Sequence, residues 1–214
     1  MISSDWNPIP KEAVSQGGRP AYIAGKTFAE RAVWDFADEH PDVDVTTICP
    51  PFMYGPLALG FSAPVPDYGA LSTDLNVFRL LKPDGIFPSF SSYVDVRDVA
   101  RAHVAALEAQ PQSILGRKRI VMSSPHGLDL KAALEMIARE RPELENRLVD
   151  LAKMPKYDSN IIPVDLSRVD EVLGISPESY FSWESTILDT VDSLIALEKE
   201  WKSKGFSVEI PNSV

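Results

Sequence analysis

Two residues near the start of the chain, Tyr22 and Lys26, have types and a spacing that suit acid–base chemistry. On a helix, residues four positions apart lie on the same face, one turn from each other. An ammonium group beside a phenol favours the phenolate form, so the tyrosine can exchange a proton with a carbonyl or an alcohol near neutral pH. The same spacing also suits an ordinary amphipathic helix. The pair is therefore a candidate site that needs support from the rest of the sequence.

The composition is that of a soluble globular protein of one domain, or of one domain with a small lobe, with 214 residues, 44% hydrophobic and 24% charged. The net charge of -10 disfavours binding to nucleic acid or to anionic membranes. One cysteine, Cys49, excludes an internal disulfide and a cysteine-cluster zinc site, and the three histidines have no metal-ligand spacing. We expect no metal site, no membrane-spanning segment and, without a secretory signal, a cytoplasmic protein.

The elements that would position the pair follow from the periodicity of the first fifty residues. Residues 1–20 are rich in proline and glycine and predict a lead-in loop. A helix is expected from about Ala21 to Asp38, and its buried stripe should carry the pair at its start. Residues of this stripe are Tyr22, Lys26, Ala29, Val33 and Phe36. The alternating residues 43–49 then predict a strand that runs into a rigid, proline-rich loop. The loop lies at the carboxyl end of the strand, which is where ligands bind in open α/β sheets.

The remaining sequence predicts further helices and one more strand. Residues 57–72 are expected to form an irregular excursion that can act as a lid. Asp95 is expected to cap a helix that reaches Leu107 and packs His103 within its apolar stripe, while Gly174 should end a short helix in a left-handed conformation. Helices are expected at 74–81, 128–141, 143–152, 164–173 and 183–202, a strand at 119–122, one domain at 21–205 and a loose tail at 206–214.

Four stretches in this order resemble the second half of an extended short-chain dehydrogenase/reductase, similar to fungal ketone reductases and plant dihydroflavonol reductases. The run from Tyr22 to Lys26 matches the Tyr-x-x-x-Lys pair of that family, and Pro50 to Pro56 resembles its loop beside the nicotinamide. The segment from Tyr93 to Ala100 resembles the Val-Asp-Val-x-Asp-Val-Ala motif, and Asp165 to Gly174 resembles a late segment that ends in Leu-Gly. The resemblance extends from about Asp5 to Lys204.

The resemblance implies an α/β fold, helix-rich, with an incomplete Rossmann-like sheet and a substrate lobe. It also implies reduction of a ketone or aldehyde with NADP or NAD as cofactor. Tyr22 would exchange the proton, Lys26 would hold the nicotinamide ribose, and Pro50, Pro51 and Phe52 would line the cofactor. By the same resemblance, the small-molecule substrate would be bound by Phe52, Tyr54 and Tyr93.

The glycine-rich turn between a strand and a helix, which binds the cofactor pyrophosphate in that family, has no counterpart in this sequence. We therefore expect a truncated reductase that lacks the nucleotide-binding half. The predicted strand at 43–49 would then expose an edge, so a homo-oligomer or a partner chain is expected to cover it. Two alternatives remain open: a small-molecule-binding relic or scaffold without redox activity, and a cofactor-independent isomerase or cyclase that uses Tyr22 as acid or base.

Overall fold

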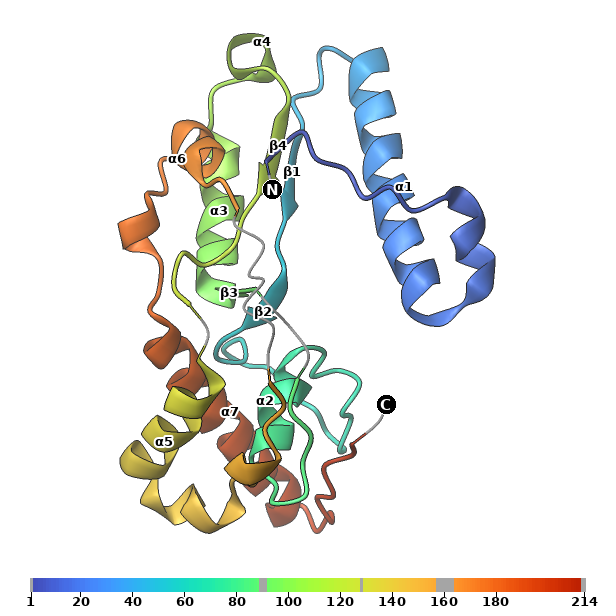
Figure 1. The fold of residues 1–214 in the computed structure, drawn as a ribbon. Coiled ribbons are helices and arrows are strands. Elements are labelled where there is room, and N and C mark those ends of the chain that lie inside the picture. The colour runs from blue at the N-terminus through green and yellow to red at the C-terminus, as the bar shows by residue number, and fades with distance from the viewer. Residues whose placement is uncertain (1, 89–91, 128, 157–163, 213–214) are drawn as a thin grey trace. The chain divides into compact units, whose positions relative to one another are not determined.

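The computed structural model describes residues 2–88, 92–127, 129–156 and 164–212. The chain forms two compact units, and each is built from three separate stretches of sequence (Figure 1). The first unit contains Met1–Cys49, Ala102–Met122 and Pro163–Ser176. The second unit contains Pro50–Arg101, Ser123–Ile162 and Pro177–Val214.

A two-stranded parallel sheet organises the first unit. Strand β1 (Thr46–Cys49) pairs with β4 (Lys118–Val121) in a register that sets Thr46 opposite Lys118. The long helix α1 contacts a preceding 3-10 turn, and α6 contacts β4. The helical elements of this unit are η1 (Lys11–Gln16), α1 (Gly18–Glu39), α4 (Gln112–Leu115) and α6 (Ser167–Leu173). The predicted strands at 43–49 and 119–122 are thus confirmed, although β1 is shorter than expected, and the expected lead-in loop contains a helical turn.

A second parallel pair of strands and a helical layer form the other unit. Strand β2 (Phe52–Tyr54) pairs with β3 (Tyr93–Asp95), and the buried core centres on helix α7, with Phe78, Leu194 and Trp201 closed to solvent. Helix α3 (Val96–Glu108) begins in this unit and ends in the first. The remaining elements of the second unit are α2 (Asp74–Leu80), α5 (Leu130–Glu140), η2 (Pro142–Arg147), η3 (Leu151–Lys153), η4 (Pro177–Ser179) and α7 (Trp183–Ser203).

The predicted helix at 143–152 is wrong, because two 3-10 turns occupy this stretch. Leu148 between them is extended, with φ -66° and ψ 147°. The break lets the amide of Val149 donate to the carbonyl of Leu80 at 2.9 Å, which joins this stretch to the end of α2. A tertiary hydrogen bond is therefore favoured over continuation of the helix. The helix predicted at 128–141 is α5, and its expected first residue, Leu128, lies outside the described residues.

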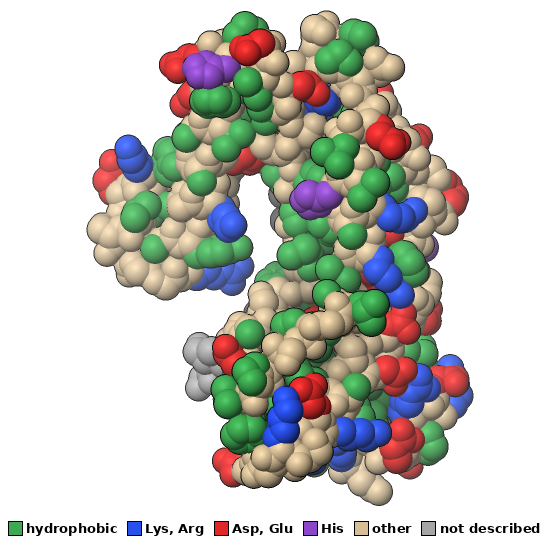
Figure 2. Space-filling view, turned by 180° about the vertical axis from the view of Figure 1, so that it is seen from behind, with side chains coloured by type: hydrophobic (Ala, Val, Ile, Leu, Met, Phe, Trp, Pro, Cys, Tyr) green, Lys and Arg blue, Asp and Glu red, His purple; other side chains and the backbone are tan. Residues whose placement is uncertain are grey.

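The predicted burial of two helices is also wrong. In α1, Tyr22, Val33 and Phe36 are 65%, 40% and 46% exposed, and the buried side chains are Ala24, Thr27, Trp34 and Ala37. In α3, the stripe predicted from periodicity is only partly buried: Val99 is buried as expected, whereas Val104 and Leu107 are 63% and 87% exposed. His103, also predicted to pack, is exposed. The space-filling view shows hydrophobic side chains open to solvent (Figure 2). Both helices present to solvent apolar stripes that their periodicity assigns to a core.

The segment after α7 is not loose, contrary to expectation. Ile210 is 7% exposed, and its carbonyl accepts a hydrogen bond from Nζ of Lys82 at 2.9 Å. The carbonyl of Pro211 accepts from Nε of Arg79 at 2.8 Å. Residues 57–72 contain no helix or strand, as expected, but indole Nε1 of Trp201 donates to the carbonyl of Ala63 at 2.7 Å. Both segments are therefore attached to the second unit by buried contacts.

Candidate active site

The candidate catalytic pair lies on the second and third turns of α1 (Gly18–Glu39). Gly17 precedes the helix with φ 71°, and Pro20 in the first turn suits a position whose amide has no helical acceptor. Nζ of Lys26 lies 5.9 Å from the ring centroid of Tyr22, and both side chains are exposed. A ligand can therefore reach the phenol and the ammonium together.

A carboxylate on α1, that of Glu30 one turn after Lys26, contacts both strands of the sheet. Its Oε1 accepts hydrogen bonds from Oγ1 of Thr47 at 2.7 Å and Sγ of Cys49 at 3.3 Å, both on β1. Arg119 on β4 donates to Oε1 from Nε at 2.9 Å and to Oε2 from Nη2 at 3.0 Å. Burial alone would raise the pKa of Glu30, but the hydrogen bonds, first that from Arg119, outweigh burial and lower it. The Glu30–Arg119 ion pair therefore fixes which face of α1 meets the sheet.

The same arginine holds the N-terminal segment. Nη1 of Arg119 donates to the carbonyls of Ser3 at 3.0 Å and Asp5 at 2.8 Å, and its guanidinium lies 4.2 Å from the ring centroid of Trp6. Arg119 is 9% exposed, so a buried charge is satisfied by one carboxylate, two carbonyls and an aromatic face.

Burial and the nearby Glu30 raise the pKa of the Cys49 thiol to about 12, which makes this cysteine a poor nucleophile.

The proline-rich loop begins the second unit and leads directly into β2. Phe52 is partly exposed and pairs with Tyr93 across the β2–β3 ladder, whereas Tyr54 and Tyr93 are 1% and 2% exposed. Gly55 follows with φ 143°, and a Cβ atom there would lie 2.6 Å from Cγ1 of Val96. Only glycine therefore allows the loop to approach the start of α3 this closely.

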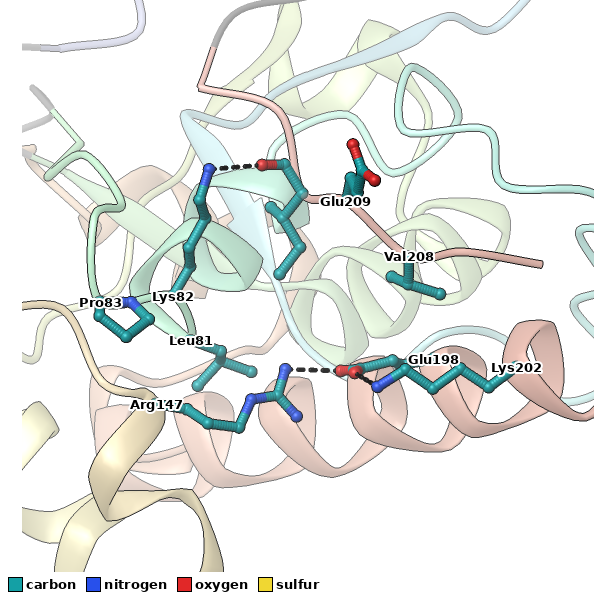
Figure 3. A pocket seen from close by; sticks show the side chains of 9 residues that line it. Leu81, Lys82, Pro83, Arg147, Glu198, Lys202, Val208 and Glu209 are labelled. Carbon is teal, nitrogen blue, oxygen red and sulfur yellow. Dashed lines mark hydrogen bonds and ion pairs between the residues drawn. The ribbon is translucent and has the colours of Figure 1, made fainter.

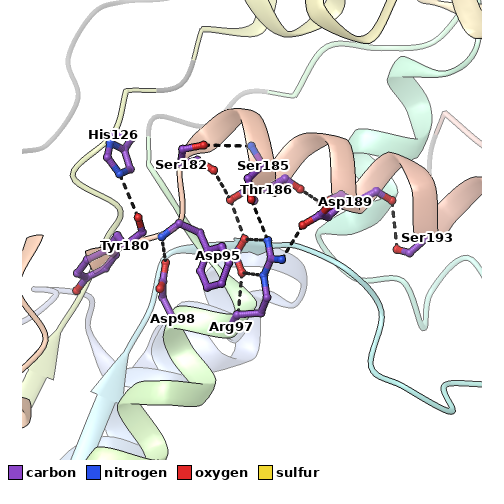
Figure 4. A network of polar contacts seen from close by, with 12 residues as sticks. Asp95, Arg97, Asp98, His126, Tyr180, Ser182, Ser185, Thr186, Asp189 and Ser193 are labelled. Carbon is purple, nitrogen blue, oxygen red and sulfur yellow. Dashed lines mark hydrogen bonds and ion pairs between the residues drawn. The ribbon is translucent and has the colours of Figure 1, made fainter. Parts of the chain in front are cut away.

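A polar network connects this loop region to α7 (Figure 4). Asp95 is fully buried, and its Oδ1 accepts from the amide and Nε of Arg97 at 2.8 and 2.9 Å, which confirms Asp95 as the cap of α3. Its Oδ2 accepts from Nη2 of Arg97 and from Oγ1 of Thr186, both at 2.7 Å. Nη1 of Arg97 also donates to Asp189 at 2.6 Å, and the guanidinium lies 3.8 Å from the ring centroid of Phe181. Four donors satisfy the buried carboxylate and lock β3 onto α7.

Asp74 at the start of α2 differs from Asp95 in its hydrogen bonding. Its Oδ1 is buried and has no hydrogen-bond partner among the described residues. Burial, and then the negative charge of Asp95, raise the pKa of Asp74 to about 7. The adjacent Thr73 side chain donates to the carbonyl of Met53 and so ties α2 to β2. The residues next to Asp74 in the sequence do not indicate its raised pKa, because that pKa depends on burial in the folded unit and on Asp95 of β3.

The predicted site residues fall into two groups. Tyr22 and Lys26 lie together in the first unit, and the five loop and pocket residues lie in the second. Within the second group, Phe52 and Tyr93 pair across the strands, and the rings of Tyr54 and Tyr93 are 6.5 Å apart. The five residues are Pro50, Pro51, Phe52, Tyr54 and Tyr93. The supporting Glu30–Arg119 pair was not predicted, because its partners are 89 residues apart in sequence.

No protein-family model matches the chain. Individual proteins do match. The chain is 29% identical over 197 residues to a protein of Candida albicans named putative NADPH-dependent methylglyoxal reductase GRP2, covering 89% of this chain and 54% of that protein. It is 31% identical over 148 residues to the NADPH-dependent methylglyoxal reductase GRE2 of Saccharomyces cerevisiae, covering 67% of this chain and 42% of that protein.

A solved structure shares the fold as well. The crystal structure of Gre2 from Candida albicans in complex with NADPH aligns with a TM-score of 0.69 and 27% identity, over 92% of this chain and 57% of that chain. The chain belongs to the extended short-chain dehydrogenase/reductase family.

Membership of this family confirms the predicted incomplete, helix-rich Rossmann-like fold. The chain spans about half the length of the curated relatives it matches. Within the described residues, no helix is both long enough and apolar enough to cross a membrane.

Proposed function

We propose that this chain is the substrate-side part of an NADPH-dependent reductase of ketones or aldehydes. The observation that carries the proposal is the exposed Tyr22–Lys26 pair, one helical turn apart on α1, in a chain related to NADPH-dependent reductases. In the reaction, NADPH supplies a hydride to the carbonyl carbon. Oη of Tyr22 gives its proton to the carbonyl oxygen, and the neighbouring ammonium stabilises the phenolate that remains.

Each unit, taken by itself, carries residues that would suit the nicotinamide end of this cofactor. The exposed ammonium of Lys26 is a donor for ribose hydroxyls, and Pro50, Pro51 and Phe52 would border the nicotinamide. The described residues contain no strand, glycine-rich turn and helix in succession for the pyrophosphate. NADP or NAD would therefore be held by this chain through its nicotinamide half alone.

The substrate pocket is proposed to contain Phe52, Tyr54 and Tyr93. Phe52 is partly exposed and can pack against an apolar part of the carbonyl compound. Tyr54 and Tyr93 lie behind it in the core, and burial raises the pKa of both hydroxyls, so they would act as a rigid neutral wall. The methylglyoxal reductases among the relatives make small 2-oxoaldehydes suitable first substrates to test.

A second chain is proposed to complete the site. Among the described residues β1 pairs with β4 alone, which leaves one edge of β1 available, and α1 presents an apolar face beside it. Another copy of this chain, or a partner that carries a nucleotide-binding half, would cover both features. The acidic composition and the reduced thiol of Cys49 suit a cytoplasmic location.

Calorimetric titration with NADPH and NADH, with the oligomeric state recorded by light scattering, tests the proposal. Methylglyoxal-dependent oxidation of NADPH should fall by roughly 10²–10⁴-fold in Tyr22→Phe. Tyr180→Phe, which also removes one phenolic hydroxyl but in the core of the second unit, should retain activity. Absence of binding at millimolar cofactor would reject a self-contained reductase, and turnover that survives Tyr22→Phe would reject the assigned acid.

A further inference from the structure

A cavity of about 510 Å³ opens on the second unit, and none of its lining residues is assigned to catalysis (Figure 3). It lies between the end of α2, the turn η2, helix α7 and the chain segment that follows α7. Its lining residues are Leu81, Lys82, Pro83, Arg147, Glu198, Lys202, Val208, Glu209 and Ile210. The volume is within the range of roughly 300–1,000 Å³ that small-molecule sites occupy.

A buried charge is built into the wall of this cavity. Glu198 on α7 is 4% exposed, and its Oε2 accepts from Nη2 of Arg147 at 2.7 Å while its Oε1 accepts from Nζ of Lys202. Burial acts to raise the pKa of Glu198, but the two cations outweigh it and lower the pKa, so the carboxylate stays charged. A buried carboxylate with two cations costs desolvation energy that an apolar side chain would not. Packing alone therefore does not explain why a charged cluster, and not an apolar side chain, occupies this position.

The arginine in this cluster has donors left for a ligand. Within the described residues, Nη2 of Arg147 donates to Glu198, and no hydrogen bond occupies Nε or Nη1. Figure 3 shows the guanidinium between the side chains of Leu81 and Glu198. Its side chain is 34% exposed, so the remaining N–H groups are accessible. A planar guanidinium fixed along one edge is well prepared to bind an anion along the other.

The remaining lining defines the class of ligand. Three cationic and two anionic side chains line the cavity, a surplus of one positive charge. Leu81 and Ile210 supply buried apolar surface, and Val208 packs against the core. Lys82 binds the carbonyl of Ile210, so the apolar wall is held in place by a contact that a ligand does not need to break.

We propose that this cavity binds a small amphipathic monoanion, with its carboxylate on Arg147 and its apolar body against Leu81, Val208 and Ile210. The site is independent of the proposed reductase activity, because none of its residues belongs to the catalytic pair or to the substrate pocket. Occupancy would hold α2, α7 and the C-terminal segment together.

Hexanoate is a suitable probe, and hexanamide is its neutral counterpart of the same shape. Amide chemical shifts of the full chain are followed during titration with each compound. We expect hexanoate to bind with a Kd on the order of 1 mM and to shift residues at 81–82, 147, 198–202 and 208–210, and hexanamide to bind at least about fivefold more weakly.

Two variants and one control decide the assignment. Arg147→Met should weaken hexanoate binding about tenfold, and Lys202→Met should weaken it by a smaller factor while leaving Arg147 on Glu198. Arg139→Met removes the same charge from an exposed position on α5 and should change nothing. Equal binding of hexanamide, or unchanged affinity in both cavity variants, would overturn the proposal. If Arg147→Met fails to fold, Lys202→Met alone decides.

Discussion

Replacing Asp74 with asparagine should remove one component of the pH dependence of stability from the second unit. In the folded protein, burial and the charge of Asp95 raise the pKa of Asp74 from 3.8 to about 7. A carboxyl whose folded pKa is raised stabilises the fold most below its unfolded pKa, and this contribution is lost as the pH rises through the folded value. Asparagine keeps the shape of the neutral acid but has no proton to lose.

The expected size of the effect follows from these two pKa values. Between about pH 5.5 and about pH 8, the folded protein loses the Asp74 proton while the unfolded chain has already lost it, which costs about 2 kcal/mol. All other carboxyl groups titrate in both proteins. The difference in free energy of unfolding between Asp74→Asn and the parent should therefore shift by about 2 kcal/mol in favour of the variant as the pH rises.

Urea unfolding monitored by tryptophan fluorescence measures this difference at the two pH values, and hydrogen exchange of α2 amides assigns it to the second unit. Glu135→Gln on α5 is the matched control, since its side chain is 58% exposed and should leave the pH dependence unchanged. Parallel pH profiles for Asp74→Asn and the parent would refute the reasoning. They would mean that Asp74 is already ionised at about pH 5.5 in the folded state.

Three further substitutions test other contacts. Arg119→Met should lower the free energy of unfolding by about 3 kcal/mol, because it leaves the partly buried carboxylate of Glu30 without its cation. Faster hydrogen exchange in α1 would reveal this loss, and unchanged exchange would contradict the anchor. Thr186→Val should lower the free energy of unfolding by about 2 kcal/mol, because it removes a donor from the buried carboxylate of Asp95. Urea unfolding should then show a lower midpoint with an unchanged slope. Gly55→Ala should lower the free energy of unfolding by about 1–3 kcal/mol through backbone strain, and by more where the new Cβ meets Val96. A melting temperature equal to that of the parent would exclude this conflict.

Local signals in the sequence predict several elements well. Gly174 ends α6 with φ 63° and ψ 24°, as its glycine predicts, and Asp95 caps α3 through a side-chain contact two residues away. The long helices at 183–202 and near Tyr22 follow from apolar periodicity and are confirmed as α7 and α1. In each case the deciding interactions lie within a few residues of the chain.

Predictions that depended on partners distant in sequence failed. The apolar stripe of α1 should be buried by its periodicity, yet the helix docks through Glu30 and Trp34 because Arg119 and Arg117 of another segment contact them. The C-terminal segment resembles a loose tail by composition, but Arg79 and Lys82 bind its carbonyls across more than a hundred residues. The raised pKa of Asp74 arises from burial and then from the charge of Asp95, which is 21 positions away in the sequence. A single sequence gives no indication of which charges will meet.

The separation between Glu30 and Arg119 also affects how the chain folds as it is synthesised. The two residues are 89 positions apart and enclose the whole first stretch of the second unit, Pro50–Arg101, so α1 leaves the ribosome long before its anchor exists. At about 5–20 residues per second, the delay is roughly 5–18 s, far longer than helix formation requires. During that interval α1 has both its polar and its apolar faces uncovered. The docking of α1 is therefore a late, non-local step of folding.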